Sequence, residues 1–137
     1  MNLGEKNNPI TEVKKVQFSL HNGETVSLRI PKSVYPPRED SILMMEILEK
    51  LKPNGIAMEI GCGSGLLSIA LAKHNWMVES CDVNPFAVSA AKENSHSASV
   101  ADKINFTECG LGDNEFNIPK NTKLLFWNLP YLNPPSI

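Results

Sequence analysis

A run of alternating glycines between two apolar segments constrains this chain more than any other feature. The run is Glu59-Ile-Gly-Cys-Gly-Ser-Gly65, which follows the apolar residues 56–58 and precedes Leu66-Leu-Ser-Ile-Ala-Leu-Ala72. Glycine permits positive φ angles, and without a Cβ it lets a ligand approach the backbone closely. The helix expected after the glycines offers backbone N–H groups that have no partner inside the helix. The pattern therefore predicts a strand, a tight turn and a helix, with a flat polar ligand lying across residues 61–65.

Composition places the chain among ordinary globular proteins. Its 137 residues are enough for one modest domain, with 42% hydrophobic and 20% charged residues. The net charge is −2 and the Lys and Arg residues are scattered, which argues against a stand-alone nucleic-acid binder. Cys62, Cys81 and Cys109 lack the paired spacing of metal ligands, so we expect reduced thiols and no metal site. Without a signal-peptide core or an apolar run approaching ~20 residues, the chain is expected to be cytoplasmic, with no membrane partner.

The N-terminal part of the chain predicts a β-hairpin. Val16-Gln-Phe-Ser-Leu20 and Thr25-Val-Ser-Leu-Arg-Ile30 each alternate apolar and polar residues. Asn22-Gly23 between them favours the positive φ angles of a tight hairpin turn. We therefore expect a polar leader and hairpin over residues 1–33, followed by a ligand-binding domain over residues 34–137.

In that second part, predicted strands alternate with predicted helices. The strands are expected at residues 56–60, 76–81, 103–107 and 123–127. The helices are expected to begin at Asp40 or Ser41, Leu66 and Pro85, and to end near Lys52, Lys73 and Asn94. The polar segment Ser95–Ala101 is expected to be a loop, and Trp76 and Trp127, both in predicted strands, are expected in the core. This alternation predicts an α/β fold with a parallel sheet and right-handed crossovers.

A polar residue closes each of the four predicted strands. The four strand ends carry Glu59 beside the glycines, Asp82, Glu108 and Asn128. In parallel sheets of this kind a ligand binds in the crevice beyond the carboxyl ends of the strands. We therefore expect these four residues to face one ligand.

A nicotinamide dinucleotide is the first ligand to consider. Its fingerprint is G-x-G-x-x-G, but here the third glycine comes one position early and Leu66 occupies its place. Glu59 would also repel a pyrophosphate in a low-dielectric cleft, whereas it suits a cation. A carboxylate at Asp82 can accept both hydroxyls of a ribose, and one at Glu108 can accept an adenine amino group. Ribose, adenine and a cationic amino-acid tail together describe S-adenosylmethionine.

Several motifs resemble those of known enzymes. Glu59–Gly65, Asp82-Val-Asn-Pro85 and Asn128-Leu-Pro-Tyr131 look like the signature set of class I S-adenosylmethionine-dependent methyltransferases. Val34-Tyr-Pro-Pro-Arg-Glu-Asp-Ser41 is similar to the segment before the core in the HemK-like family, especially its archaeal and eukaryotic branch. That family methylates the glutamine of translation release factors. The resemblance extends from Val34 to Pro135 and implies a Rossmann-like sheet.

The resemblance also implies roles for individual cofactor-binding residues. It assigns the amino-acid portion of the cofactor to Ser41, Glu59 and Gly61, the ribose to Asp82, and the adenine to Glu108 and the Cys109 backbone, with Gly63 in the glycine turn. The Cys109 thiol has no role in this assignment.

The catalytic motif is implied to be Asn128-Leu-Pro-Tyr131. The Asn128 side chain and the Leu129 carbonyl would accept the two hydrogens of a substrate NH2 group. This aims the nitrogen lone pair at the methyl carbon, so that positioning and electrostatics supply the catalysis. Pro130 keeps Leu129 extended, and Tyr131 would pack on the flat substrate group.

Two features depart from the family pattern. Leu129 stands where the family usually has proline, so the φ restraint of that proline is lost. Family members also continue for several strands and helices beyond the motif, so we expect the C-terminal strands of the sheet to be missing. Residues 124–127 would then form an apolar edge that is prone to aggregation unless another chain covers it.

Three functions therefore stay open. The leading one is methylation of a release-factor glutamine, for which the resemblance also suggests a small zinc-binding activator subunit. The second is methylation of a nucleic-acid amino group, at adenine N6 or guanine N2, because those targets are chemically similar. The third is a truncated, non-catalytic fragment that binds the cofactor.

Overall fold

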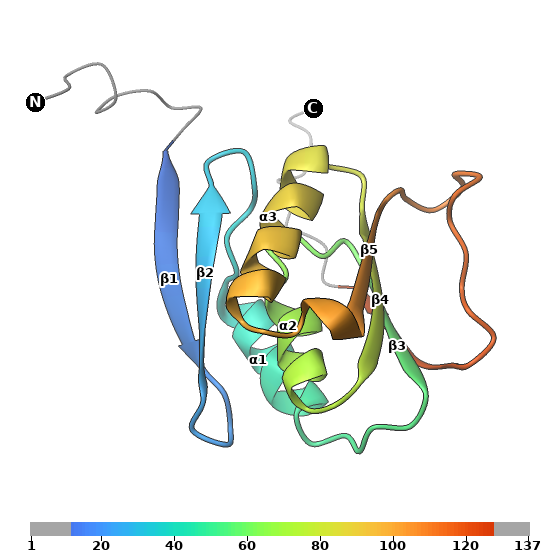
Figure 1. Ribbon diagram of the computed structural model, residues 1–137, viewed down its shortest axis with the longest axis horizontal. Helices are drawn as coiled ribbons and strands as arrows, with labels where there is room; N and C mark the ends of the chain where they lie inside the picture. The colour runs from blue at the N-terminus through green and yellow to red at the C-terminus, as the bar shows by residue number, and fades with distance from the viewer. Residues whose placement is uncertain (1–11, 128–137) are drawn as a thin grey trace, which may run out of the picture.

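The computed structural model describes residues 12–127, which form two β-layers with helices between them (Figure 1). The outer layer is a hairpin of β1 (Val13–Ser19) and β2 (Thr25–Pro31), which pair antiparallel. Gly23 in the turn takes a φ of +89°, a value that only glycine adopts readily. The predicted hairpin is confirmed.

The inner layer is a sheet of four parallel strands. In chain order they are β3 (Ile56–Ile60), β4 (Met77–Asp82), β5 (Ile104–Glu108) and β6 (Thr122–Trp127). Their spatial order is β5-β4-β3-β6, and each neighbouring pair is parallel. The chain moves outward from β3 to β5 and then returns to the other side of β3. Such a reversal opens a crevice at the carboxyl ends of the strands. The expected α/β, Rossmann-like sheet with an N-terminal hairpin is confirmed.

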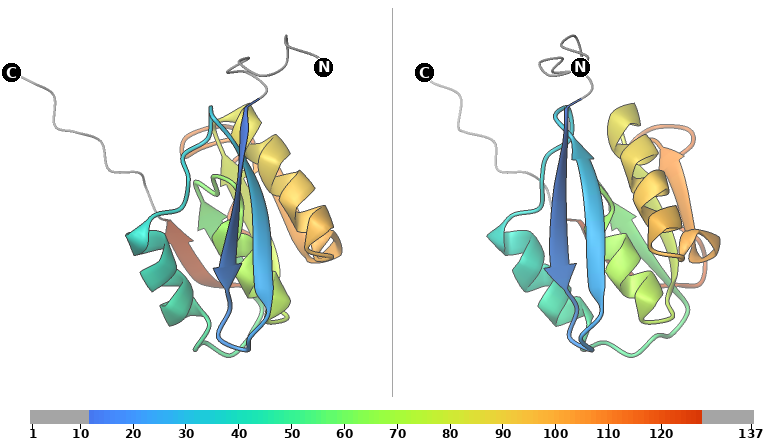
Figure 2. Two further views of the ribbon diagram at one scale, coloured as in Figure 1. Left: turned by 90° about the vertical axis from the view of Figure 1, so that its left-hand side faces the viewer. Right: turned by 60° about the vertical axis from the view of Figure 1, so that its left-hand side comes forward.

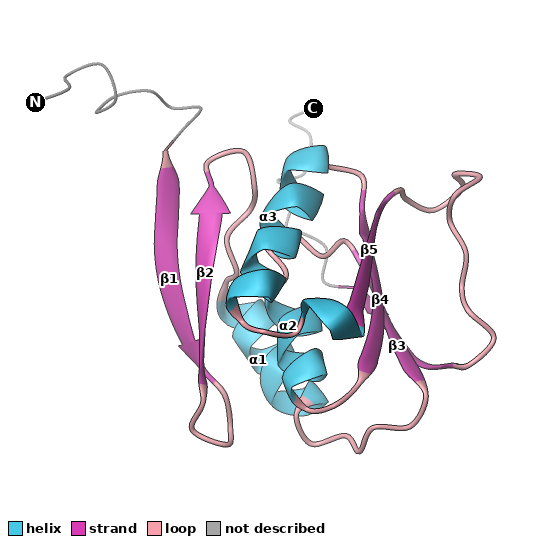
Figure 3. Cartoon of the chain, in the orientation of Figure 1, coloured by secondary structure: helices cyan, strands magenta, loops and turns pink. Residues whose placement is uncertain are grey.

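The helices lie on one face of this sheet, between it and the hairpin (Figure 3). They are α1 (Glu39–Leu48), α2 (Leu66–Lys73) and α3 (Pro85–Ser97), and a short 3-10 turn, η1 (Ala101–Lys103), precedes β5. Every residue of α2 from Leu66 to Ala72 is buried. A helix that is apolar on all sides needs cover on all sides, and α2 contacts β4, β3, α1, α3 and β2. Within residues 12–127, no helix is both long and apolar enough to span a membrane.

The hairpin lies across the outer side of the helical layer (Figure 2). Burial alternates along β2, so that Val26, Leu28 and Ile30 face inward and are each at most 2% exposed. These side chains belong to the same apolar cluster as residues of α2 and α3. The hairpin is therefore packed on the helices, and a domain boundary near residue 33 stays a prediction.

The start and the end of α1 differ from the sequence-based expectation. The N-cap is Arg38, whereas Asp40 and Ser41 both lie inside the first turn. Ser41 instead contributes its Oγ, which accepts a hydrogen bond from the Arg38 N–H at 3.2 Å. The helix ends at Leu48, before the expected end near Lys52. Beyond it the N–H groups of Lys50 and Leu51 donate to carbonyls only three residues back, at Ile47 and Leu48, so the last turn tightens.

The expected loop at Ser95–Ala101 was partly wrong, because α3 continues to Ser97. Asn94 and Ser95 are 1% and 2% exposed, although both are polar. The Ser95 hydroxyl donates a hydrogen bond to the Lys92 carbonyl at 2.7 Å, and Asn94 has backbone partners on other elements. Satisfied buried polar groups therefore extend a helix that composition alone would end.

The face of the sheet away from the helices carries a second, smaller apolar cluster. It consists of Met58, Ile60, Cys81 and Cys109, with Phe116 packed against them. Phe116 belongs to the long connection between β5 and β6, so this connection covers part of the outer face.

Within the described residues, β6 forms one edge of the sheet, as expected. Leu125 and Trp127 on this strand are 41% and 52% exposed. The expectation that Trp127 lies in the core was wrong, because it faces away from the helices on an edge strand. Trp76 is 3% exposed and does lie in the core, although β4 begins only at the next residue.

Candidate functional site

A cavity of about 450 Å³ opens beyond the carboxyl ends of the sheet strands. Ligand pockets typically have volumes of roughly 300–1,000 Å³, so a ligand of cofactor size fits. The lining comes from residues 34–38 and 40–41 at the start of α1, residues 59–64 and 66–67 around the glycine turn, residues 82–84 and 87 after β4, and residues 109–111 after β5. Four separate stretches of the chain thus meet at one site.

The glycine turn has the left-handed backbone that its sequence predicted. Gly61, Gly63 and Gly65 have φ angles of +81°, +55° and +97°. The Gly61 N–H donates a hydrogen bond to the Cys81 carbonyl at 2.8 Å, which fastens the turn to the end of β4. A Cβ added at Gly65 would lie 3.1 Å from the Ala91 Cβ, so glycine also allows α2 to begin close against α3.

Asp82 holds the glycine turn and the start of α3 together. Its Oδ2 accepts a hydrogen bond from the Gly63 N–H, and its Oδ1 accepts one from the Asn84 N–H, both at 2.9 Å. Asn84 in turn caps α3 by accepting from the Phe86 N–H and donates to the Ser33 carbonyl at 3.0 Å. Each carboxylate oxygen has a second lone pair, so Asp82 can still accept hydrogen bonds from ligand hydroxyls.

Glu59 is a buried acid in the lining of the cavity. It is 2% exposed, and its Oε1 lies 2.7 Å from the Ser68 Oγ, which lies 3.0 Å from the Ser80 Oγ. Burial raises the pKa of Glu59 from 4.5 to about 8, and the nearby Asp82 carboxylate adds to the rise, whereas hydrogen bonding from Ser68 opposes it. The Glu59 carboxyl is therefore mostly protonated at neutral pH until a cation arrives.

The buried thiols of Cys62 and Cys81 have no nucleophilic character at neutral pH. Burial, and then the carboxyls of Glu59 and Asp82, raise the pKa of the Cys62 thiol far above its ordinary range. Burial likewise raises the pKa of the Cys81 thiol to about 11. Because the thiolate is the nucleophilic form, neither Cys62 nor Cys81 is suited to covalent catalysis.

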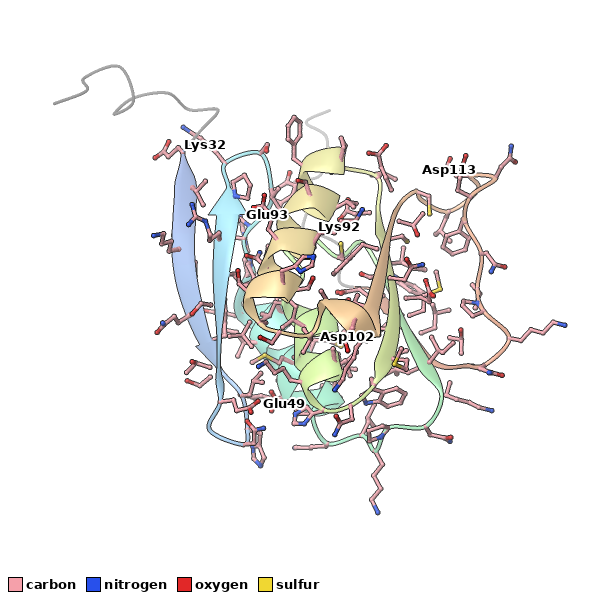
Figure 4. All side chains as sticks on the ribbon, in the orientation of Figure 1. Lys32, Glu49, Lys92, Glu93, Asp102 and Asp113 are labelled. Atoms are coloured by element: carbon pink, nitrogen blue, oxygen red, sulfur yellow. The ribbon has the colours of Figure 1, made fainter. Side chains whose placement is uncertain are left out.

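The connection after β5 closes another side of the cavity. The Cys109 N–H donates to the Asp82 carbonyl at 3.1 Å. The Gly110 N–H donates to the Asp113 Oδ2 at 2.8 Å, and Asp113 lies on this connection beyond the end of β5 (Figure 4). Glu108, the last residue of β5, is exposed and is not part of the lining.

The structure thus brings most of the predicted cofactor-binding residues together. The predicted residues that line the cavity are Ser41, Glu59, Gly61, Gly63, Asp82 and Cys109. Their roles, and the role of Glu108, stay predictions. The predicted catalytic residues Asn128, Leu129, Pro130 and Tyr131 lie outside the described residues.

Sequence analysis did not identify Asn94, which supports the glycine turn although it does not line the cavity. Asn94 accepts a hydrogen bond from the Arg29 N–H at 2.9 Å and donates to the Arg29 carbonyl at 3.1 Å. It also donates to the Ser64 carbonyl in the glycine turn at 2.8 Å. Asn94 therefore joins the hairpin to the glycine turn. Its partners are backbone groups far along the chain, so no local pattern could have indicated this role.

Comparison with known proteins identifies relatives along most of the chain. The family model described as "Ribosomal protein L11 methyltransferase (PrmA)" matches residues 40–122. A protein of Methanocaldococcus jannaschii named "Putative protein N5-glutamine methyltransferase" is 39% identical over 110 residues, which cover 80% of this chain and 53% of that protein. The "Release factor glutamine methyltransferase" of Dictyoglomus turgidum is 30% identical over 112 residues, which cover 77% of this chain and 38% of that protein. The chain thus spans about half of the first relative and less of the second.

Solved structures share the fold. The crystal structure of P. horikoshii TYW2 in complex with MeSAdo matches 82% of this chain and 41% of that chain, with a TM-score of 0.66 and 16% identity. An RNA methyltransferase from Salinibacter ruber, in complex with S-adenosyl-L-homocysteine, matches 70% of this chain and 61% of that chain, with a TM-score of 0.57 and 21% identity. At such identities the likeness shows the fold alone.

The family assignment rests on the sequence matches and agrees with the fold. The matched residues 40–122 include the glycine turn, Asp82 and the connection after β5, all of which line the cavity. The family model matches more than half of the residues of this chain. The chain therefore belongs to the ribosomal protein L11 methyltransferase (PrmA) family and, with it, to the class I S-adenosylmethionine-dependent methyltransferases.

Proposed function

We propose that the cavity binds S-adenosylmethionine with its amino-acid tail toward Glu59 and its adenosyl group toward β4 and β5. The Glu59 carboxylate receives the ammonium group, and the free lone pairs of Asp82 receive the ribose hydroxyls. The Cys109 backbone contacts the adenine, and Glu108, the residue before it, is a second candidate for the adenine amino group. Ser41 lies beside the amino-acid portion.

The residues that line the cavity fit this ligand. A buried carboxyl costs free energy in its charged form unless a cation accompanies it, and the raised pKa of Glu59 reflects that cost. An ammonium group would supply the missing charge. The glycine turn leaves its backbone uncovered for a ligand, since a Cβ built at Gly63 has a single neighbour within 4 Å, the Tyr35 carbonyl oxygen at 3.8 Å.

We propose further that the chain belongs to an enzyme that methylates the side-chain amide of a glutamine in a translation release factor. The observation that carries this proposal is the 39% identity, over 80% of this chain, to a protein named for N5-glutamine methylation. The bound cofactor supplies an electrophilic methyl group on a sulfonium. The methyl moves from sulfur to the amide nitrogen, and that nitrogen loses one proton.

The chain's own residues would position the acceptor. Asn128 and the Leu129 carbonyl accept the two amide hydrogens, and this holds the nitrogen lone pair toward the methyl carbon. In this proposal Pro130 would restrict the backbone of Leu129, and Tyr131 would pack on the planar amide. We also propose that a small zinc-binding subunit assists this enzyme, on the basis of the HemK-like resemblance of Val34–Ser41.

A second candidate function is methylation of ribosomal protein L11, which the description of the matching family model favours. A third is methylation of RNA. A protein of Alcanivorax borkumensis named "Ribosomal RNA small subunit methyltransferase C" is 39% identical over 57 residues, or 40% of this chain. These acceptors differ in chemical class, so one experiment separates them.

The test offers methyl-labelled S-adenosylmethionine together with one of three acceptors: a release factor that carries a Gly-Gly-Gln loop, ribosomal protein L11, or ribosomal RNA. We expect label in the release factor, and no label when the loop glutamine is replaced by alanine. Asp82→Ala should abolish transfer, whereas Asp102→Ala, which removes an exposed acid outside the cavity, should not. Label in L11 or RNA alone would select the corresponding alternative. Binding of S-adenosylhomocysteine without transfer to any acceptor would support the non-catalytic reading.

A further inference from the structure

The cavity lining contains one cationic side chain. Arg38 is the only Lys, Arg or His among the described residues that line the cavity, whereas Asp40, Glu59 and Asp82 are acids. Acids outnumber cations in this lining, which favours a sulfonium and an ammonium group. It repels a carboxylate, and the amino-acid tail of S-adenosylmethionine carries one. A cation near that carboxylate would balance the acids of the lining.

Arg38 is fixed in backbone position, and no described acid forms an ion pair with it. Pro36 and Pro37 precede it and restrict the chain, and its N–H donates to the Ser41 Oγ at 3.2 Å at the start of α1. Among residues 12–127 the one ion pair joins Lys32 and Glu12 at 3.6 Å, so the Arg38 guanidinium is not paired with any carboxylate of these residues. It is also exposed and therefore accessible to a ligand.

We propose that Arg38 binds the carboxylate of the amino-acid tail and so positions the methyl donor. This inference rests on the proposed binding of S-adenosylmethionine. A guanidinium presents a planar fork of N–H donors that matches a carboxylate with two parallel hydrogen bonds. Glu59 then holds the ammonium group from the end of β3, and Arg38 holds the carboxylate from the start of α1. Arg38 is a specificity residue as well, because it favours adenosyl ligands that carry the carboxylate.

Three ligands separate this role from a general effect on the fold. S-adenosylhomocysteine carries the full amino-acid tail, its decarboxylated analogue keeps the amine only, and methylthioadenosine lacks both groups. Calorimetry on the wild type should give the tightest binding for S-adenosylhomocysteine. We expect Arg38→Ala to weaken that binding by roughly tenfold or more, as for a lost charged hydrogen bond, with little change for the other two ligands. Arg38→Lys should retain part of the affinity because it keeps the charge and loses the fork.

Lys32→Ala is the matched control. It removes a cation from the segment before α1, and Lys32 itself does not line the cavity. It should leave the affinities of all three ligands unchanged. An equal loss of affinity for all three ligands in Arg38→Ala would mean that Arg38 acts through the structure of α1, and would overturn the proposal. An unchanged affinity for S-adenosylhomocysteine would overturn it too. If the wild type binds none of the three ligands, the proposed function fails first and the Arg38 proposal fails with it.

Discussion

Replacing Glu59 by glutamine should flatten the pH dependence of folding stability. Glutamine has nearly the same shape, and its Oε1 can still accept the hydrogen bond from Ser68 that Glu59 accepts at 2.7 Å. It has no charge to bury at any pH. The pKa of Glu59 is about 8 in the folded protein and 4.5 as its ordinary value. The folded state therefore holds a proton between these pH values that the unfolded chain has lost.

The sign follows from proton linkage. Because the pKa of Glu59 is raised by folding, the free energy of unfolding falls as pH rises from about 4.5 to about 8, and it levels off above that. Each tenfold step in proton affinity is worth about 1.4 kcal/mol. Between pH 5 and pH 8 the free energy of unfolding of the wild type should therefore fall by on the order of 3–4 kcal/mol. Glu59→Gln should not show this decrease.

Urea unfolding of both proteins from pH 5 to pH 8 measures this difference, because the other titrating groups cancel in the comparison. Glu46→Gln removes one negative charge from an exposed position on α1 and serves as the control. We expect the free energy of unfolding of Glu59→Gln, relative to that of the wild type, to increase steadily as the pH rises. If the two proteins lose stability in parallel over this range, the account of Glu59 as a buried, protonated acid is refuted.

The same residue predicts proton release on ligand binding. An ammonium group beside Glu59 favours its charged form, so binding of S-adenosylhomocysteine at pH 7 should expel the proton. With a pKa of about 8, the wild type should release about 0.9 proton. Calorimetry in buffers of different ionisation enthalpy counts that proton, and Glu59→Gln should release none at this site. Release that is equal in both proteins would place the ammonium group elsewhere.

Other positions give sharp tests of the same architecture. Asn94→Ala removes three hydrogen bonds of α3, two to the hairpin and one to the glycine turn, so urea unfolding should show a loss of roughly 2–4 kcal/mol. Gly65→Ala adds a Cβ 3.1 Å from the Ala91 Cβ at a φ of +97°, whereas Gly112→Ala, at a φ of +90°, meets nothing within 4 Å. Gly65→Ala should therefore lower the Tm more than this control does, and equal Tm losses would argue against the close contact. Asp82→Asn should weaken binding of S-adenosylhomocysteine and methylthioadenosine alike by roughly tenfold, since both carry the ribose, and an effect on only one ligand would contradict ribose binding at this position.

Local patterns predicted the centre of the fold well, for a physical reason. Around Glu59–Gly65 the end of the strand, the turn and the start of the helix are determined by neighbouring residues, so a local sequence pattern is enough to predict them. Each φ in the turn is positive where glycine stands. The alternation of strands and helices then brought Asp82 and Cys109 to the same crevice, because the carboxyl ends of parallel strands share one edge of the sheet.

The misjudged elements were those decided by distant partners. Composition ended α3 near Asn94, but the hydrogen bonds of that side chain to the hairpin and the glycine turn stabilise the helix beyond it. Trp127 was assigned to the core because it ends an apolar strand, but burial depends on what covers its face of the sheet, and Trp127 is 52% exposed. The cap of α1 is a local exception, because the Oγ of Ser41, inside the first turn, accepts a hydrogen bond from the Arg38 N–H three residues earlier.

The geometry of the cavity links ligand binding to the assembly of the fold. Glu59 extends from the central strand, whereas Arg38 lies at the start of α1, on a segment that Asn84 holds through the Ser33 carbonyl. A zwitterionic tail that bridges the two would tie α1 to the sheet, and it can do so only in the folded protein. A ligand that binds only the folded state stabilises it by about 2.7 kcal/mol at a hundredfold excess over Kd. Part of that stabilisation should therefore disappear in Arg38→Ala for S-adenosylhomocysteine and not for methylthioadenosine, since only the tail reaches from β3 to α1.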